Sequence, residues 1–202
     1  MSLIRRGYAL LLVVFVSSCA IGPILNHDVA RSNGDGNHDI KIMSSVDGLW
    51  GFHYDYGLTD DLDIGVQWEA LSAGLKLKYA LVNNQKSGLS VALGAGTGTS
   101  FGGSYYNGAL FVSYKSKTFE PFASVRYTSV ENDSTDLKDA DTGELFVTIP
   151  AFNYNYTQAF LGTKIWFVDW FALSLEAGSF IASGDVKFDS NVFYSAAFEF
   201  AF

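Results

Sequence analysis

The chain has few of the residues that stabilise or mark the common soluble classes of protein. It holds one cysteine, Cys19, among 202 residues, so a disulfide cannot form within the chain. Lysine and arginine number 13 against 21 aspartate and glutamate residues, and this acidic balance argues against nucleic-acid binding, which needs basic patches. After residue 16, no run approaches the 18 apolar residues of a transmembrane helix.

Apolar and small residues are abundant instead. The composition is 49% hydrophobic and 16% aromatic, with 20 glycines and only 17% charged residues. A chain this apolar without a transmembrane helix is either a soluble domain with a large core or a transmembrane β-barrel. The many glycine and aromatic residues favour the barrel.

The first 18 residues have the pattern of a bacterial signal peptide. Two arginines precede the apolar run 8–16, which is too short to span a bilayer as a helix. The residues 16–19, Val-Ser-Ser-Cys, resemble the lipobox of bacterial lipoproteins. That resemblance implies cleavage before Cys19, a diacylglyceryl thioether and an N-acyl chain on this cysteine, and, because Ala20 follows, export to the outer membrane. The alternative is an ordinary signal peptide cut near Ala20 or Gly22.

Residues 19–37 show no regular alternation. Without residues 1–18 the chain carries 11 basic and 21 acidic residues, a net charge of −10. The polar stretch 32–37 is typical of a flexible tether. We therefore expect a lipidated N-terminus and tether over 19–37 and a barrel over 38–202.

From residue 38 onward, apolar residues alternate with small or polar ones, which is the period of a β-strand. The last eleven residues alternate up to the final Phe202. This ending resembles the C-terminal signal strand that the barrel-assembly machinery of bacterial outer membranes recognises. The residues that carry this assembly signal are Tyr194, Phe198, Phe200 and Phe202.

The lengths of the connections predict the number of strands. The connections 57–61, 82–87, 115–118 and 168–170 are short, whereas 97–104, 131–152 and 181–190 are longer, as in outer-membrane barrels with short periplasmic turns and long external loops. Counting back from a last strand that runs to the periplasm requires an upward strand at 39–43. The sequence thus predicts an all-β, antiparallel up-and-down transmembrane barrel of about ten strands, with eight as the runner-up and both termini periplasmic.

The face opposite the large apolar residues is mostly glycine, alanine and serine with scattered charges, which suits a narrow lumen. Charges in such a lumen need partners. We expect a network of inward salt bridges that plugs the barrel, with a narrow selective channel as the alternative. Its members are Asp55, Asp63, Glu69, Lys76, Lys78, Arg126, Lys164, Glu176 and Glu199.

Catalytic and metal signals are weak. His53 and Asp55 resemble part of an outer-membrane hydrolase site, but a serine is not clearly placed to complete it, so we expect no enzyme. The acidic loop 131–144 contains Asp139 and Asp141, which are weak candidates for a divalent cation, and a solvated run of charges explains them better. We expect no cofactor.

Two further resemblances concern the fold. Residues 48–50, Gly-Leu-Trp, match the Gly-x-Trp that opens lipocalins, which implies a binder with its apolar residues inside. Residues 56–66 resemble the hairpin of uncharacterised outer-membrane barrel families. The best expectation is a porin-like outer-membrane lipoprotein of a Gram-negative bacterium with a structural or surface-interaction role. Its partners are outer-membrane lipids, the assembly machinery and an unknown ligand of the external loops.

Overall fold

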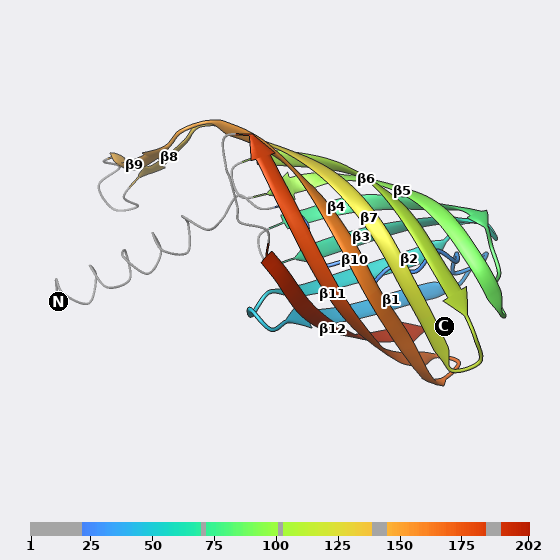
Figure 1. The fold of residues 1–202 in the computed structure, drawn as a ribbon. Coiled ribbons are helices and arrows are strands. Elements are labelled where there is room, and N and C mark those ends of the chain that lie inside the picture. Colours follow the sequence, from blue (N-terminus) through green and yellow to red (C-terminus); the bar gives the residue numbers. More distant parts are fainter. Residues whose placement is uncertain (1–21, 70–71, 101–102, 139–144, 185–190) are drawn as a thin grey trace, which may run out of the picture.

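The computed structural model describes residues 22–69, 72–100, 103–138, 145–184 and 191–202. Within these residues, ten antiparallel strands close into a barrel, and a separate two-stranded hairpin extends beyond one end (Figure 1). The order around the barrel is β1-β12-β11-β10-β7-β6-β5-β4-β3-β2. The barrel strands are β1 (His38–Ser45), β2 (Trp50–Gly57), β3 (Leu62–Glu69), β4 (Ser72–Val82), β5 (Gly88–Ser100), β6 (Gly103–Lys115), β7 (Phe119–Asn132), β10 (Phe152–Val168), β11 (Phe171–Gly184) and β12 (Asn191–Ala201). The hairpin strands are β8 (Thr135–Lys138) and β9 (Leu145–Ile149).

The predicted fold class is confirmed, and the count is ten rather than the runner-up eight. The weakly patterned stretch at 39–43 belongs to β1, which pairs with β12 from Asp39↔Ala201 to Ser45↔Ser195. At the end of this seam the main chains of His38 and Phe202 exchange hydrogen bonds of 2.6 and 2.9 Å. Pairing of the first and last strands leaves the sheet without an open edge.

The barrel has two different ends. The connections β2–β3, β4–β5, β6–β7 and β10–β11 lie with Phe202 at what we call the turn end, and the remaining connections lie at the loop end. The hairpin β8–β9 belongs to the long connection between β7 and β10 at the loop end (Figure 1). The expected loop 97–104 is instead mostly strand, because β5 and β6 stay paired as far as Ser100 and Gly103.

Alternation decides which side chains enter the barrel. In β12, for example, Tyr194 and Phe198 are exposed while Ser195 and Glu199 are buried. Among the described residues, no helix is long and apolar enough to cross a membrane.

Inward aromatic rings lie against inward glycines of neighbouring strands. A side chain added at Gly162 would meet the ring of Phe122 at 2.4 Å, and one added at Gly178 would meet Phe193 at 2.3 Å. Each glycine therefore provides the space that the ring occupies. Tyr154 also points inward and is 2% exposed, because the even-numbered residues of β10 face the lumen.

Residues 22–34, which we call the luminal segment, run through the inside of the barrel. Leu25, His27, Ala30 and Ser32 in this segment have no exposed surface. Leu25 packs in an apolar cluster with Met43, Phe160, Phe193 and Ala197. The expectation of a flexible tether is therefore wrong for these residues: their polar groups bind the barrel wall instead of water.

Candidate functional site: the filled lumen

The luminal segment extends from one end of the barrel to the other. At the loop end, a side chain added at Gly22 would contact Tyr156 and Thr128, which lie near the ends of β10 and β7. At the turn end, the amide of Gly36 donates to the carbonyl oxygen of Gly57 at 2.9 Å, and β1 begins two residues later. Gly22 and Phe202 therefore lie toward opposite ends of the barrel.

The chain reverses direction at the turn end through glycines. Gly34 and Gly36 have φ of +86° and +75°, a conformation that side chains disfavour. Opposite them, Gly57 lies so close that an added Cβ would overlap the carbonyl of Gly34. Glycine at position 57 is therefore required by the passing chain.

The loop-end half of the luminal segment is bound mainly through its main chain. Glu69 accepts hydrogen bonds from the amides of Ile24 and Leu25 at 2.6 and 2.8 Å. Arg126 donates to the carbonyl oxygens of Pro23 and Leu25 at 2.6 and 3.1 Å. Because the wall side chains satisfy these main-chain groups, the segment can lie buried in the lumen without forming a strand.

The turn-end half, residues 28–34, is bound through charged and polar side chains as well as through main-chain groups such as the amide of Ala30, which donates to Ser113. Asp28 accepts from Lys41 and Lys76, both at 2.9 Å, and Arg31 donates to Glu120 at 2.8 Å. The hydroxyl of Ser32 donates to Asp63 at 2.6 Å. This half therefore depends on the identity of its residues.

Lys41 connects the luminal segment with the wall. Its ammonium lies 2.9 Å from Asp28, 2.6 Å from Asp39 and 2.9 Å from Asp55, and its side chain is 2% exposed. Lys76 joins the same cluster through Asp55 at 3.0 Å. A buried ammonium group needs carboxylates around it, so this cluster fixes the position of Asp28 along the barrel axis.

The structure places every residue of the expected charge network inside the barrel, but it divides them by role. Lys78 pairs with Asp63 at 3.1 Å, and Lys164 pairs with Glu199. Glu69, Arg126 and Glu176 bind the luminal segment instead of one another. Further members of the network lie where the sequence has no clear alternation, in the assumed tether, in the weakly patterned β1 or at the start of β7: Asp28, Arg31, Asp39, Lys41 and Glu120.

His27 has an unusual main chain and a fully buried ring. Its φ is +55°, which is uncommon for a residue with a side chain. The ring nitrogens lie 2.9 Å from the hydroxyls of Ser174 and Ser195, and the amide donates to Glu176 at 2.9 Å. These contacts stabilise the unusual main-chain conformation at His27. They also place serine, histidine and glutamate together, but the luminal segment covers the group, so it fits structural hydrogen bonding rather than catalysis.

The other candidate chemistry does not assemble in the described part. His53 lies 3.2 Å from Glu69 and 3.3 Å from Lys76, so it belongs to the lumen network rather than to a hydrolase site with Asp55. Among the described residues, no three His, Cys, Asp or Glu side chains are grouped to hold a metal ion. The weak metal candidates Asp139 and Asp141 lie outside the described residues.

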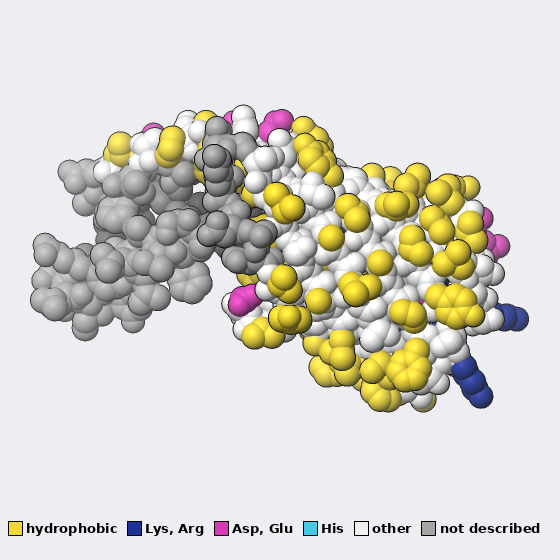
Figure 2. Space-filling view, viewed as in Figure 1, with side chains coloured by type: hydrophobic (Ala, Val, Ile, Leu, Met, Phe, Trp, Pro, Cys, Tyr) yellow, Lys and Arg dark blue, Asp and Glu magenta, His cyan; other side chains and the backbone are white. Residues whose placement is uncertain are grey.

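The outer face of the barrel is apolar, whereas the lumen is polar. Leu75, Leu93, Val125 and Leu161 are 56%, 49%, 49% and 69% exposed. On the face seen in Figure 2, hydrophobic side chains cover the wall, and the charged ones lie toward the two ends. This inside-out arrangement excludes the lipocalin alternative, which needs its large apolar residues around an internal ligand.

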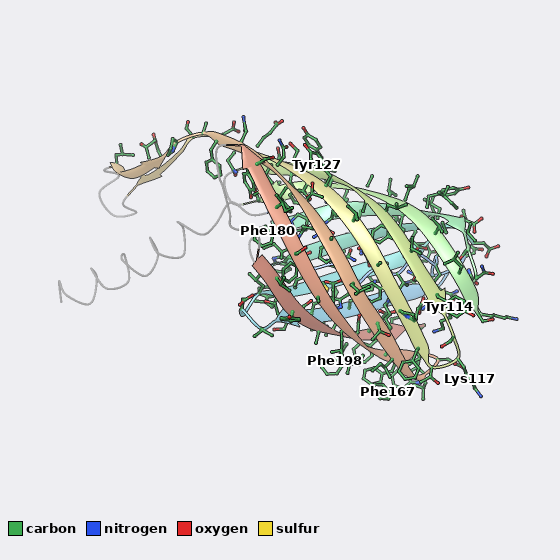
Figure 3. The ribbon with its side chains drawn as sticks, in the orientation of Figure 1. Tyr114, Lys117, Tyr127, Phe167, Phe180 and Phe198 are labelled. Atoms are coloured by element: carbon green, nitrogen blue, oxygen red, sulfur yellow. The ribbon has the colours of Figure 1, made fainter. Side chains whose placement is uncertain are left out.

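Exposed aromatic residues gather toward the two ends of the wall. In Figure 3, Tyr127 lies toward the loop end, whereas Tyr114 and Phe167 lie toward the turn end, with Lys117 beyond them. Three aromatic residues of the expected assembly signal point outward: Tyr194, Phe198 and Phe202 are 59%, 53% and 64% exposed. Aromatic belts of this kind mark the two interfaces of a bilayer.

The fold and the lumen together define a class: a closed, ten-stranded antiparallel barrel with an apolar outer wall and a polar lumen filled by its own N-terminal segment. Comparisons with protein-family models and with curated proteins give no match.

Solved structures do show similarity to the chain. The N-terminal β-barrel domain of Pseudomonas aeruginosa OprF is 12% identical, with 84% of this chain and 99% of that one covered and a TM-score of 0.43. The KdgM porin is 11% identical, with 82% and 99% covered and a TM-score of 0.40. Neisserial surface protein A (NspA) is 13% identical, with 82% and 94% covered and a TM-score of 0.38.

Proposed function

We propose that this chain is a bacterial outer-membrane β-barrel protein. Its apolar outer wall, its closed sheet and its aromatic residues at both ends are what a bilayer requires of a spanning structure. The turn end, which carries the short connections and Phe202, faces the periplasm, and the loop end faces the medium.

The proposal includes processing and assembly. The signal peptide covers residues 1–18, and Cys19 becomes the lipidated first residue, so outer-membrane lipids are partners of both the wall and the anchor. The exposed, alternating aromatic residues of β12 support recognition of this strand by the barrel-assembly machinery. Incorporation of labelled palmitate into the wild type, and its loss in Cys19→Ala, tests the lipid.

We infer a structural or surface-interaction role, with the barrel closed to solutes. The observation that carries this role is the filled lumen: the luminal segment is buried inside the barrel, and the cavity beside Asp28, lined by the segment and by β2–β7, has a volume of about 20 Å³, which is room for about one water molecule. The hairpin β8–β9 extends beyond the loop end and offers a surface to an external partner (Figure 1).

Heat-modifiability and conductance test this function. The folded barrel should migrate differently before and after boiling, and the purified protein should carry no steady ion current in a planar bilayer. Asp28→Lys places an ammonium beside Lys41 and Lys76 and should release the luminal segment, so this variant should conduct. A steady current from the folded wild type would contradict the closed barrel.

A narrow selective channel is the second candidate. The observation that favours it is the charged lining of the lumen, which would remain if the luminal segment left the barrel. Voltage-dependent opening of the wild type, absent when the segment is cross-linked to the wall, would establish this function in place of the closed one.

A further inference from the structure

We infer that the luminal segment carries the N-terminal side of the chain across the membrane, so that Gly22 lies on the external side, opposite Phe202. The inference rests on the proposed orientation of the barrel, with its loop end outward. An ordinary barrel of ten strands has both ends of its chain on the same side of the membrane, whereas here the two ends lie on opposite sides.

The number of passages explains the difference. An even number of strands returns the chain to the side on which it began, so His38 and Phe202 lie together at the turn end. The luminal segment adds one more passage before β1. Its thirteen residues can extend over about 40 Å, which exceeds the apolar thickness of a bilayer.

The direction of the passage is fixed by contacts along its length. Pro23 binds Arg126 and Tyr156 toward the loop end. In the middle, Asp28 binds Lys41 and Lys76.

Toward the turn end, the amide of Asn33 donates to Asp63 at 3.1 Å, and Ser32 binds Asp63 and Asn83. The contacts at the loop end, in the middle and at the turn end thus occur in the order of the chain, from Pro23 through Asp28 to Asn33. Reversing the segment would separate Asp28 from Lys41 and Arg31 from Glu120.

The consequence is an exposed N-terminal side of the mature chain. Cys19 precedes Gly22 by three residues, a reach of about 10 Å. An acyl anchor on this cysteine would then enter the outer leaflet, whereas an N-terminus on the periplasmic side would place it in the inner leaflet.

A disulfide in the full chain tests the path. A Cβ on Gly22 would lie 3.3 Å from the Thr128 methyl carbon, so Gly22→Cys with Thr128→Cys should form a disulfide that a reducing agent removes on a gel. Gly22→Cys with Ser90→Cys is the matched control, because Ser90 is buried near the turn end, and it should stay unlinked. Gly22→Cys alone controls for pairing with Cys19.

Epitopes test the orientation separately. An epitope inserted after Ser134 at the loop end should be detected on intact cells, and one after Lys86 at the turn end only after permeabilisation. Detection after Ser134 without the disulfide would overturn the inference and leave the proposed function intact. Detection after Lys86 on intact cells would overturn the proposed orientation itself.

A second pair covers the case in which the first double variant does not fold, as judged by heat-modifiability. Leu25 lies 3.3 Å from a Cβ built on Gly51, next to the loop-end connection between β1 and β2. Leu25→Cys with Gly51→Cys should be joined by a short bismaleimide. Failure to join in a folded barrel would overturn the inference.

Discussion

The two halves of the luminal segment are held in different ways. In the loop-end half the wall binds main-chain groups, as Glu69 and Arg126 do, and the side chain of Leu25 adds apolar packing. In the turn-end half, charged side chains of the segment meet charged side chains of the wall. We therefore expect the loop-end half to tolerate more substitutions than the turn-end half.

Removing the charge of Asp28 should have the largest effect. Asp28→Asn leaves the buried ammoniums of Lys41 and Lys76 with fewer carboxylates, and we expect the barrel to lose about 3 kcal/mol of unfolding free energy. Chemical unfolding in detergent micelles measures the loss. Asp35→Asn, at an exposed position of the same region, is the control and should change little. Equal stability of the two variants would show that the ion pairs do not hold the segment.

Changing Glu69 should have an intermediate effect. Glu69→Gln keeps an acceptor for the amides of Ile24 and Leu25 but removes its charge, so we expect a loss of about 1.5 kcal/mol. The temperature at which the folded gel band disappears should fall accordingly. Glu131→Gln, an exposed residue at the loop end, serves for comparison. A loss as large as that of Asp28→Asn would remove the distinction between the halves.

The smallest effect should come from a side chain in the loop-end half. Ile24 is partly buried, and the wall binds its amide and carbonyl groups. Ile24→Val removes one methyl group while keeping both main-chain hydrogen bonds, and we expect a loss of about 0.5 kcal/mol. The same unfolding measurement applies. A loss above that of Glu69→Gln would mean that side-chain packing, not the main chain, anchors this half.

The strand pattern could be predicted from the sequence because the wall has a different environment on each face. Outward residues such as Leu75 are apolar and exposed, whereas inward ones such as Lys76 face the polar lumen, so alternation appears directly in the sequence. The charged wall residues of the lumen followed from the same alternation. The strand at 39–43, now part of β1, followed from parity rather than from pattern.

The luminal segment could not be predicted in this way. Wall side chains surround it, so its sequence has no period, and Ser32, Asn33 and Gly34 look like a solvated linker. The apolar residues Leu25 and Val29 did indicate that this stretch is buried, because a solvated tether has no need of them. The inward direction of Tyr154 could not be read from the sequence, because an aromatic ring near a strand end suits either the outer wall or a lumen.

The arrangement of the luminal segment also determines how it would respond to force. The segment runs from the loop end to the turn end of the barrel, and Glu69, Arg126 and Asp63 of the wall bind it at successive points along its length. A pull on Gly22 along the axis would load these contacts together in shear, instead of opening them one after another as in a peeled hairpin. The filled lumen is therefore mechanically strong along its axis.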